Sequence, residues 1–256
     1  MNDTPQPNTT QPLLLNGARG RMGRAIIEAA AGAGFEVTGI DQGDTPGPLV
    51  RDTTVVVDFS HHTATLPLAL LCARHGKPLV IGTTGHSEEE RARIHEAVRE
   101  IPVVWAGNYS VGVTLLNQLA RIAAQTLDPS FQVELVEMHH RHKKDAPSGT
   151  AETLLQIIRH ARALPPTALR HGRQGLTGGR PADEIGVHAL RGGDVVGDHT
   201  VIFAGEGERL ELAHKASSRA IFALGALRAA RWLIPPPGAP ARTPAIYNMA
   251  HVLGLE

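Results

Sequence analysis

The segment from residue 137 to residue 151 combines side chains that transfer protons with small residues that start helices. Three histidines, one arginine and two lysines fill the six positions from His139 to Lys144. The whole chain has only four lysines against twenty-one arginines, so two adjacent lysines here stand out. Histidine titrates near neutrality, and the pKa of lysine shifts readily on burial. The segment is therefore suited to giving and taking protons.

The residues that follow predict an anion-binding helix start. Pro147 suits the first helical position, and Asp145 or Ser148 can cap the free backbone N–H groups. A helix that starts at residues 148–150 presents N–H donors and a positive dipole end, which attract a carboxylate. Proton donors would thus lie beside a site for an anionic substrate.

Two other interpretations of this segment remain open at this point. A run of His and Lys on a loop is often a solvated turn. A metal site would need suitably spaced ligands, but His139, His140 and His142 lack the i, i+4 spacing of a zinc helix, and no cysteine lies nearby. We therefore expect no metal.

The composition is typical of a globular protein of one large or two smaller domains. The 256 residues are 42% hydrophobic and 20% charged, and the formal net charge is zero. With no basic stripe, nucleic acid is not an expected partner. Cys72, the single cysteine, lies in an apolar run and cannot form an internal disulfide. No signal pattern or membrane-spanning run is evident, so we expect a cytoplasmic protein without membrane contact.

A glycine-rich turn near the N-terminus predicts dinucleotide binding. An apolar strand at residues 12–16 leads into Gly17, Gly20 and Gly23, and a helical pattern begins at Arg24. Strand, glycine turn and helix form the context in which such glycines let the backbone approach a pyrophosphate. The G-x-x-G-x-x-G spacing is a variant of the usual fingerprint and is weak evidence alone.

An acidic residue strengthens this interpretation. The alternating segment 35–40 ends at Asp41, which could accept hydrogen bonds from the adenosine ribose. A chance Asp at a strand end is the alternative. Residues 82–85 and 107–110 also follow predicted strands. Since ligands of parallel sheets bind beyond the carboxyl ends of the strands, these segments would share one edge.

The order of elements predicts an α/β fold with a Rossmann-type parallel sheet, followed by a smaller α+β domain with a mixed or antiparallel sheet. Three late alternating segments joined by turns, at residues 184–190, 195–204 and 209–213, indicate antiparallel pairing, and residues 165–183 read as a long loop. The predicted divisions are a disordered tail at 1–11, a dinucleotide domain at 12–109 and 220–256, and a substrate-binding and oligomerisation domain at 110–219.

These segments resemble the 4-hydroxy-tetrahydrodipicolinate reductase family (dihydrodipicolinate reductases) of bacterial lysine and diaminopimelate synthesis. The run His-His-x-x-Lys-x-Asp-Ala-Pro-Ser-Gly-Thr-Ala, at residues 139–151, is highly specific to that family. Further matching runs cover nearly the whole chain from residue 13, at 17–24, 57–60, 80–85, 108–113, 191–200 and 207–219.

The resemblance implies roles for individual residues. His139 would be the proton donor or acceptor, and Lys143 the second proton donor. The substrate, a small dicarboxylate, would be bound by His140, Ser148, Gly149, Thr150 and Arg219. A nicotinamide dinucleotide would be contacted by Gly17, Ala18, Arg19, Gly20, Arg21, Met22, Asp41, Gly82, Thr83, Thr84, Ala106, Gly107, Asn108 and Tyr109. Members of the family are typically homotetramers assembled through the sheets of the substrate domain.

Departures from the family pattern bear on the cofactor. Arg19 stands where relatives often have Gly, and Tyr109 where they often have Phe. Many relatives follow the ribose acid with Arg, which can meet a 2′-phosphate, whereas Gln42 follows Asp41 here. Asp41 should repel that phosphate, so we predict a preference for NADH. Arg19 or Arg21 could still reach it, and use of NADPH stays open.

The predicted chemistry is reduction of a cyclic unsaturated imine, which needs a hydride on one carbon and a proton on its neighbour. Because hydride and proton would come from different domains, we expect the domains to close on the substrate. Two alternatives differ in class: another Rossmann enzyme, such as an aspartate or amino-acid dehydrogenase, and a non-catalytic dinucleotide-binding regulator. The first lacks the 139–151 run, and the second has no need of proton donors.

Overall fold

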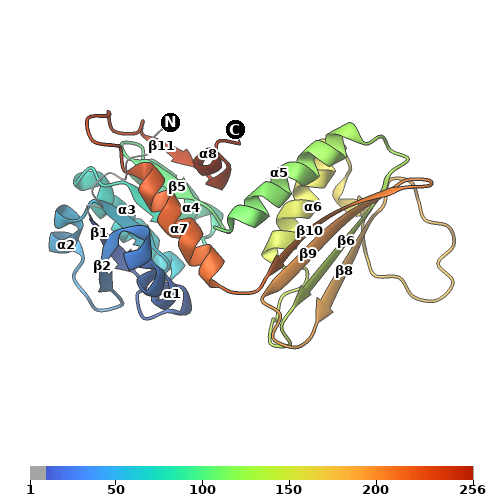
Figure 1. The fold of residues 1–256 in the computed structure, drawn as a ribbon, viewed down its shortest axis with the longest axis horizontal. Coiled ribbons are helices and arrows are strands. Elements are labelled where there is room, and N and C mark those ends of the chain that lie inside the picture. The colour runs from blue at the N-terminus through green and yellow to red at the C-terminus, as the bar shows by residue number, and fades with distance from the viewer. Residues whose placement is uncertain (1–9, 256) are drawn as a thin grey trace. The chain divides into compact units, whose positions relative to one another are not determined.

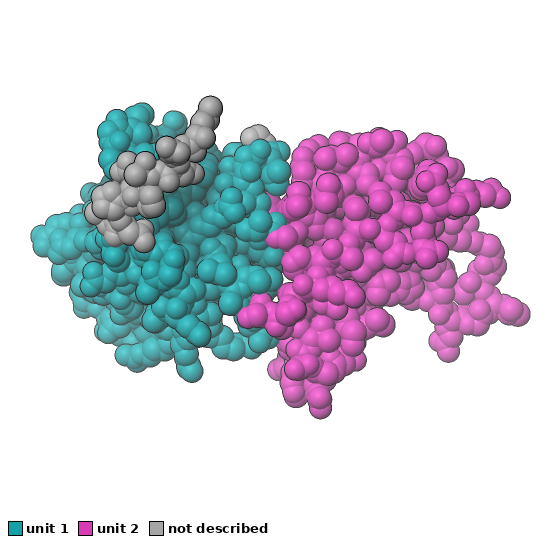
Figure 2. Space-filling view, in the orientation of Figure 1, with its two compact units in different colours: residues 1–111, 219–256 teal, residues 112–218 magenta. Residues whose placement is uncertain are grey.

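The protein forms two compact units, described here in a computed structural model that covers residues 10–255. Of the described residues, unit 1 comprises residues 10–111 and 219–255, and unit 2 comprises residues 112–218 (Figure 2). Residues 1–9 of the predicted disordered tail lie outside the described residues, and Gln11 already begins the first strand. None of the helices between residues 10 and 255 is long and apolar enough to span a membrane.

Unit 1 contains a six-stranded, entirely parallel sheet in the order β11-β5-β4-β3-β1-β2 (Figure 1). This confirms the predicted Rossmann-type fold. The chain order reverses between β1 and β3, which is where ligands of such sheets bind. The strands are β1 (Gln11–Asn16), β2 (Phe35–Ile40), β3 (Val55–Asp58), β4 (Leu79–Ile81), β5 (Pro102–Trp105) and β11 (Ala245–Tyr247).

Helices cover both faces of this sheet, because its strands are apolar on both sides. Leu13 and Leu15 pack into one core with the helices α1, α7 and α8, whereas Leu14 packs on the opposite face with α2, α3 and α4. The helices are α1 (Arg21–Ala30), α2 (Gly47–Asp52), α3 (His62–Arg74), α4 (Glu88–Ala97), α7 (Ala220–Leu233) and α8 (Met249–Leu253), and a 3₁₀ turn η1 spans Ala31–Ala33.

Local capping explains where two of these helices begin. Ser87 and Glu90 form the capping box that starts α4. Asn248 accepts from the first N–H groups of α8, which follows the short strand β11. The sequence had not predicted β11 or α2, because three apolar residues and a six-residue helix give too little periodicity to recognise.

Unit 2 contains a five-stranded mixed sheet in the order β10-β9-β6-β8-β7. Its central strand is β6 (Gln132–His139), which alternates between a buried and a half-buried face. In Figure 1, α5 (Val111–Thr126) and α6 (Gly149–Ala161) lie against one face, and their apolar residues share a core with Leu135, Val201 and Phe203. The other strands are β7 (Leu169–His171), β8 (Ile185–Arg191), β9 (Gly197–Ala204) and β10 (Arg209–Ala216), and a second 3₁₀ turn η2 spans Pro166–Ala168.

The mixed sheet confirms one of the two predicted sheet forms, but the last three strands do not form one antiparallel set. β9 pairs antiparallel with both β10 and β6, but β8 lies on the other side of β6 and runs parallel to it. The helix α6 supplies the crossover that a parallel pair requires. Part of the predicted loop also forms β7, parallel to β8.

Candidate active site

The glycine turn of unit 1 is shaped for close approach of another backbone or a ligand. Gly17 has φ +85°, and a Cβ there would lie 2.3 Å from the carbonyl oxygen of Phe59. A Cβ at Gly23 would lie 2.2 Å from the oxygen of Gly17. Gly20 precedes α1, and no side chain caps that helix start. The first backbone N–H groups of α1 are therefore not capped by a side chain, which suits a pyrophosphate site.

Asp41 joins this turn to the end of β2. Its carboxylate accepts the backbone N–H of Arg19 and that of Gln42, each at 2.9 Å. The hydrogen bond from Arg19, and then that from Gln42, lowers the pKa of Asp41 below its usual value. Asp44 lies beside it, since the N–H of Asp41 donates to its carboxylate at 2.8 Å. The site thus carries two adjacent carboxylates.

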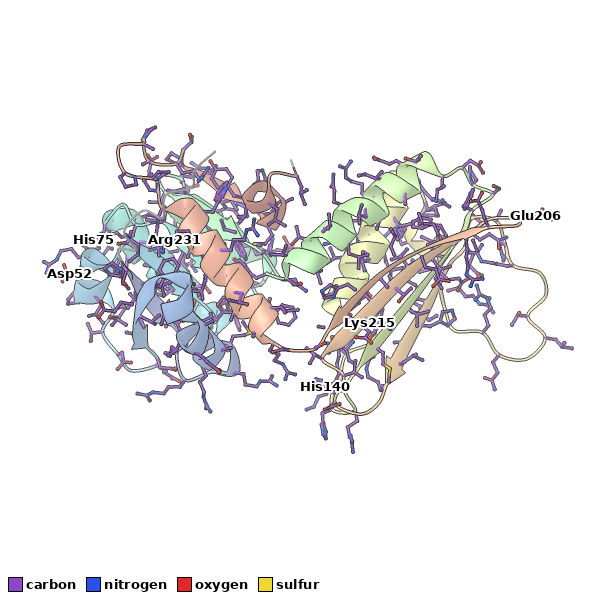
Figure 3. All side chains as sticks on the ribbon, in the orientation of Figure 1. Asp52, His75, His140, Glu206, Lys215 and Arg231 are labelled. Atoms are coloured by element: carbon purple, nitrogen blue, oxygen red, sulfur yellow. The ribbon has the colours of Figure 1, made fainter. Side chains whose placement is uncertain are left out.

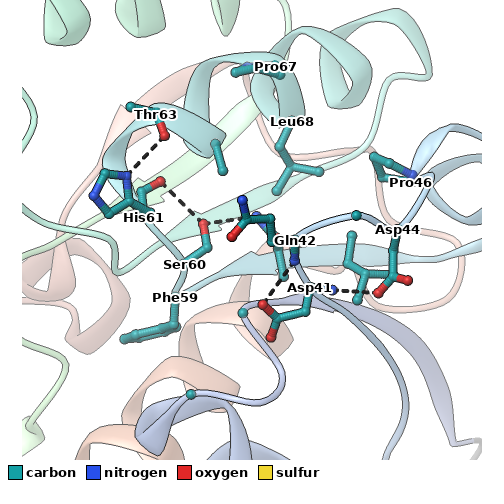
Figure 4. Close-up of a pocket in the computed structure, with 16 residues that line it drawn as sticks. Asp41, Gln42, Asp44, Pro46, Phe59, Ser60, His61, Thr63, Pro67 and Leu68 are labelled. Atoms are coloured by element: carbon teal, nitrogen blue, oxygen red, sulfur yellow. Dashed lines mark hydrogen bonds between the residues drawn. The ribbon is translucent and has the colours of Figure 1, made fainter.

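A cavity of about 740 Å³ lies at this edge, at the point where the strand order reverses (Figure 4). Its lining includes three of the predicted cofactor residues, Gly17, Gly20 and Asp41, and residues of α3 line another side. Most of the other residues that line the cavity were not predicted as site residues; these others are Asn16, Ile40, Gln42, Gly43, Asp44, Pro46, Phe59, Ser60, His61, Thr63, Ala64, Pro67 and Leu68.

The other predicted segments follow β4 and β5 at the same edge, but their side chains differ in role. Thr83 is buried, and its hydroxyl contacts the carboxylate of Asp58 at 3.0 Å and accepts the N–H of Ser60. Tyr109 is 2% exposed, and its hydroxyl lies 2.8 Å from the carbonyl oxygen of Ile81. Burial raises the pKa of Tyr109 well above its usual value. Thr83 and Tyr109 therefore support the edge with their side chains and leave the backbone to face a ligand.

The remaining cofactor candidates lie on the outer part of this edge. Arg19, Arg21, Thr84 and Gly107 are exposed, and Ala18, Met22, Gly82, Ala106 and Asn108 are half-buried. A Cβ at Gly82 would lie 2.2 Å from the ring of Phe59, so any other residue there would force that ring to move.

In unit 2, His139 occupies the last position of β6 and is 8% exposed. Its Nδ1 lies 2.6 Å from Oε2 of Glu137, which is fully buried two residues earlier on the same face of the strand. Arg191, at the end of β8, donates to both oxygens of Glu137, at 2.9 and 2.8 Å. Burial would raise the pKa of Glu137, but the hydrogen bonds from Arg191 and His139 outweigh it and lower that pKa.

The start of α6 lies against the same carboxylate. The backbone N–H of Ser148 donates to Oε1 of Glu137 at 3.1 Å, and the Ser148 hydroxyl caps α6 by accepting the N–H of Ala151. That hydroxyl also lies 3.0 Å from Nε2 of His199 on β9. The predicted proton donor and the predicted anion site are therefore joined through Ser148 and one buried glutamate.

His199 packs edge-on against His139, with ring centroids 5.2 Å apart. It is 3% exposed. Desolvation, followed by the charge of His139, lowers the pKa of His199 to about 4. Near neutral pH His199 is therefore uncharged, and it packs against the ring of His139 as a neutral imidazole.

Lys143 lies in the turn between β6 and α6. Its ammonium group is 2.8 Å from the carboxylate of Asp145, which is largely exposed, and its backbone N–H donates to the oxygen of His140. The hydrogen bond from the Lys143 ammonium group is the main cause that lowers the pKa of Asp145. Figure 3 labels His140 and Lys215 at the end of the sheet where β6 finishes, in agreement with the register Met138–Asp198–Lys215.

The predicted substrate residues fall in both units. His140, Ser148, Gly149 and Thr150 belong to unit 2, around the start of α6. Arg219 is exposed at the N-cap of α7 and belongs to unit 1, with the predicted cofactor residues. Among residues 10–255, no group of three His, Cys, Asp or Glu side chains is arranged to hold a metal ion.

Three residues of this site were not among the predicted site residues: Glu137, Arg191 and His199. The alternation of β6 placed Glu137 on the face of His139, so that signal could have found it. Arg191 and His199 come close only because β8 and β9 flank β6, a pairing that spacing along the chain does not reveal.

Comparison with protein families matches both halves of the chain to one family. Residues 11–109 match the family model described as "Dihydrodipicolinate reductase, N-terminus", and residues 112–253 match "Dihydrodipicolinate reductase, C-terminus".

Comparison with individual proteins gives the same family. A 4-hydroxy-tetrahydrodipicolinate reductase of Akkermansia muciniphila is 53% identical over 248 residues, which are 95% of this chain and 98% of that protein. One from Thiobacillus denitrificans is 46% identical and covers 94% of this chain and 97% of its own length. Among solved structures, dipicolinate-bound dihydrodipicolinate reductase from Paenisporosarcina sp. TG-14 has a TM-score of 0.75 at 22% identity. It covers 93% of this chain and 97% of its own.

Proposed function

The chain belongs to the dihydrodipicolinate reductase family, and from that premise we propose that it reduces 4-hydroxy-tetrahydrodipicolinate to tetrahydrodipicolinate with NADH or NADPH. It is an oxidoreductase, and its reaction lies on the diaminopimelate route to lysine. The observation that carries the proposal is that family matches cover both units, including the dinucleotide edge of one and the His139 site of the other.

The residues of unit 1 fit a nicotinamide dinucleotide. The uncapped start of α1 and the turn at Gly17 and Gly20 would hold the pyrophosphate, and Asp41 would bind the adenosine ribose. Residues 82–84 and 106–109 would line the path to the nicotinamide. When bound, the cofactor supplies the hydride.

NADH is the proposed preferred cofactor. Supporting this, Asp41 is held ionised and Asp44 lies against it, so a 2′-phosphate would approach two negative charges. The guanidinium groups of Arg19 and Arg21 are the nearby cations that would permit use of NADPH.

His139 would provide the proton for the carbon next to the one that receives the hydride. Because Nδ1 of His139 is engaged by Glu137, Nε2 would be the atom that faces the substrate. Lys143 would be the second proton donor and would stabilise the charge that changes at the ring nitrogen. The substrate carboxylates would be bound at the start of α6, by Gly149 and Thr150, with His140, Ser148 and Arg219 contributing.

Since these groups belong to two units, we propose that the units close on the substrate for each turnover. A variant with a disulfide holding the units open should lose turnover and regain it on reduction. Full activity in the oxidised form would disprove closure.

A homotetramer in the cytoplasm is the proposed working form. The face of the unit 2 sheet opposite α5 and α6 carries half-buried Val136, Met138 and Ile202, and Leu190 there is 48% exposed. Such a face is suited to pairing with the same sheet of another copy. Light scattering on the purified protein would test this, since a monomeric mass would rule it out, and cell fractionation would test the location.

The direct test of the activity is cofactor oxidation by the purified protein. Substrate would be generated in situ from pyruvate and aspartate semialdehyde by its synthase, and absorbance at the nicotinamide band followed with each cofactor. Turnover dependent on both synthase and protein supports the proposal. Dinucleotide binding without turnover would contradict it.

A further inference from the structure

Glu137 accepts hydrogen bonds from both His139 and the start of α6, and this geometry assigns it a role that its burial alone does not explain. We propose that Glu137 is a positioning residue: it fixes which nitrogen of His139 exchanges the proton and aligns that nitrogen with the carboxylate-binding helix start. The inference rests on the proposed role of His139 in proton transfer.

Of the four hydrogen bonds described here for the Glu137 carboxylate, three come from groups that can only donate. Oε2 lies 2.6 Å from Nδ1 of His139 and accepts a guanidinium N–H of Arg191 at 2.9 Å. Oε1 accepts the other guanidinium nitrogen at 2.8 Å and the N–H of Ser148 at 3.1 Å. An ionised carboxylate has only acceptors. Nδ1 of His139 must therefore carry a hydrogen, and Nε2 is the nitrogen left to give or take the catalytic proton.

The other ring nitrogen of His139, Nε2, lies beside Gly197. A Cβ at Gly197 would lie 2.9 Å from Nε2, so any side chain at that position would crowd the nitrogen. His199 is uncharged near neutrality and contacts the ring edge-on, so it restricts rotation without competing for the proton.

Arg191 holds Glu137 in place from a third element. Besides its two bonds to the carboxylate, its guanidinium donates to the backbone oxygen of Asp145 at 2.7 Å. The turn that carries Lys143 is thus joined to the same carboxylate. One buried side chain thereby sets the relative positions of His139, the Lys143 turn and the start of α6.

Glu137→Gln is a sharp test, because the amide must place its NH₂ group on one of two sites. At the Oε1 site the NH₂ would meet two donors, Arg191 and the N–H of Ser148. At the Oε2 site it would meet one fixed donor, Arg191, and His139, which can change tautomer. We expect the second arrangement, which moves the hydrogen of His139 to Nε2.

The first readout is the tautomer of His139, which needs no substrate. In ¹⁵N-histidine-labelled protein, with His139→Asn used for assignment, wild-type His139 should show a protonated Nδ1 and an unprotonated Nε2 when neutral. Glu137→Gln should reverse them. An unprotonated Nδ1 in the wild type would overturn the proposal even if the variant fails to fold.

The second readout is kinetic. Glu137→Gln should lower kcat about 100-fold, the scale of losing a correctly oriented acid–base group, with the KM for NADH changed less than about twofold. In the His139→Ala background the same substitution should cause less than a threefold further loss, because a positioning residue acts through its partner. Additive losses, or an unchanged kcat in the single variant, would overturn the proposal.

Glu134→Gln is the matched control. Glu134 lies three residues earlier on β6 and also accepts from arginines, Arg173 at 2.7 and 3.1 Å and Arg180 at 3.1 Å, but on the other face. The Glu134→Gln variant should be less stable than the wild type, but its kcat should stay within about twofold and the His139 tautomer should be unchanged. A kcat loss equal to that of Glu137→Gln would mean general damage to β6 and would overturn the assignment. If His139→Ala alone were fully active, the proposed function of His139 would fail, whereas the tautomer measurement would still decide the role of Glu137.

Discussion

The two predicted binding regions differ in which part of the chain forms them: one is formed mainly by backbone groups and the other by side chains. The dinucleotide edge of unit 1 is made of backbone: Gly17 and Gly23 let chains approach to distances that no Cβ permits, and Asp41 is held by backbone N–H groups. The His139 site of unit 2 is made of side chains from β6, β8, β9 and the start of α6. The first should therefore be sensitive to added atoms, and the second to removed or altered functional groups.

The largest expected effect is on the side-chain site. His139→Ala and Lys143→Ala should each lower kcat about 10²- to 10⁴-fold, the contribution of a positioned acid–base group. Because unit 1 keeps its backbone site, the Kd for NADH should stay within about twofold. Steady-state kinetics and fluorescence titration with NADH would measure both. A parallel loss of NADH affinity would show that the two regions are not independent.

The reverse experiment adds one methyl group to the backbone site. In Gly23→Ala the new Cβ would lie 2.2 Å from the oxygen of Gly17 and 2.6 Å from that of Ala18, which the turn can accommodate only by moving. We expect the free energy of unfolding to fall by about 3 kcal/mol and NADH affinity to fall with it.

Gly32→Ala is the control for this substitution. A Cβ at Gly32 would contact nothing within 4 Å, so stability and affinity should be unchanged or slightly improved. Wild-type NADH binding by Gly23→Ala would refute the view that close backbone approach defines this edge.

The backbone site could be predicted from the sequence more completely than the side-chain site. Glycine spacing and an acid after the next strand are local signals, so the sequence predicted Gly17, Gly20 and Asp41 as cofactor residues, and they line the observed cavity. His139 was predicted as a proton donor from its own segment. Its partners Arg191 and His199 lie 52 and 60 positions away, and the parallel β6–β8 pairing, which was not predicted, brings Arg191 to Glu137. Side-chain networks depend on register, which one sequence does not specify.

A third prediction concerns pH. Burial depresses the pKa of His199 to about 4 in the folded state, against 6.5 for an exposed histidine. Its neutral form therefore contributes stability that is complete above pH 6.5 and is lost as pH falls toward 4, up to roughly 3 kcal/mol. His139, Glu137, His214 and Lys143 also act on His199 electrostatically.

His199→Gln removes that titration and can keep a hydrogen bond to Ser148. Its thermal unfolding should be flatter than that of the wild type between pH 6.5 and 4. His171→Gln, at an exposed position of β7, should leave the wild-type curve unchanged. Equal slopes in all three proteins would show that the buried histidine is not what makes the side-chain site sensitive to acid.

The smallest expected effect is in unit 1, at Asp41, where a side-chain charge acts on the backbone site. Asp41→Asn keeps an oxygen that can accept one of the two N–H groups but removes the negative charge facing a 2′-phosphate. Two like charges about 4 Å apart in water repel by about 1 kcal/mol, so kcat/KM for NADPH should rise about five- to tenfold relative to NADH.

Asp52→Asn is the control for this substitution. It alters an exposed carboxylate of the same unit that pairs with Arg51 and does not line the cavity, so it should leave the ratio unchanged. Wild-type protein that uses both cofactors equally well would refute the NADH preference. An unchanged ratio in Asp41→Asn would instead mean that Arg19 and Arg21 decide the choice, and that even cofactor selection at this edge does not depend on the carboxylate that its backbone holds.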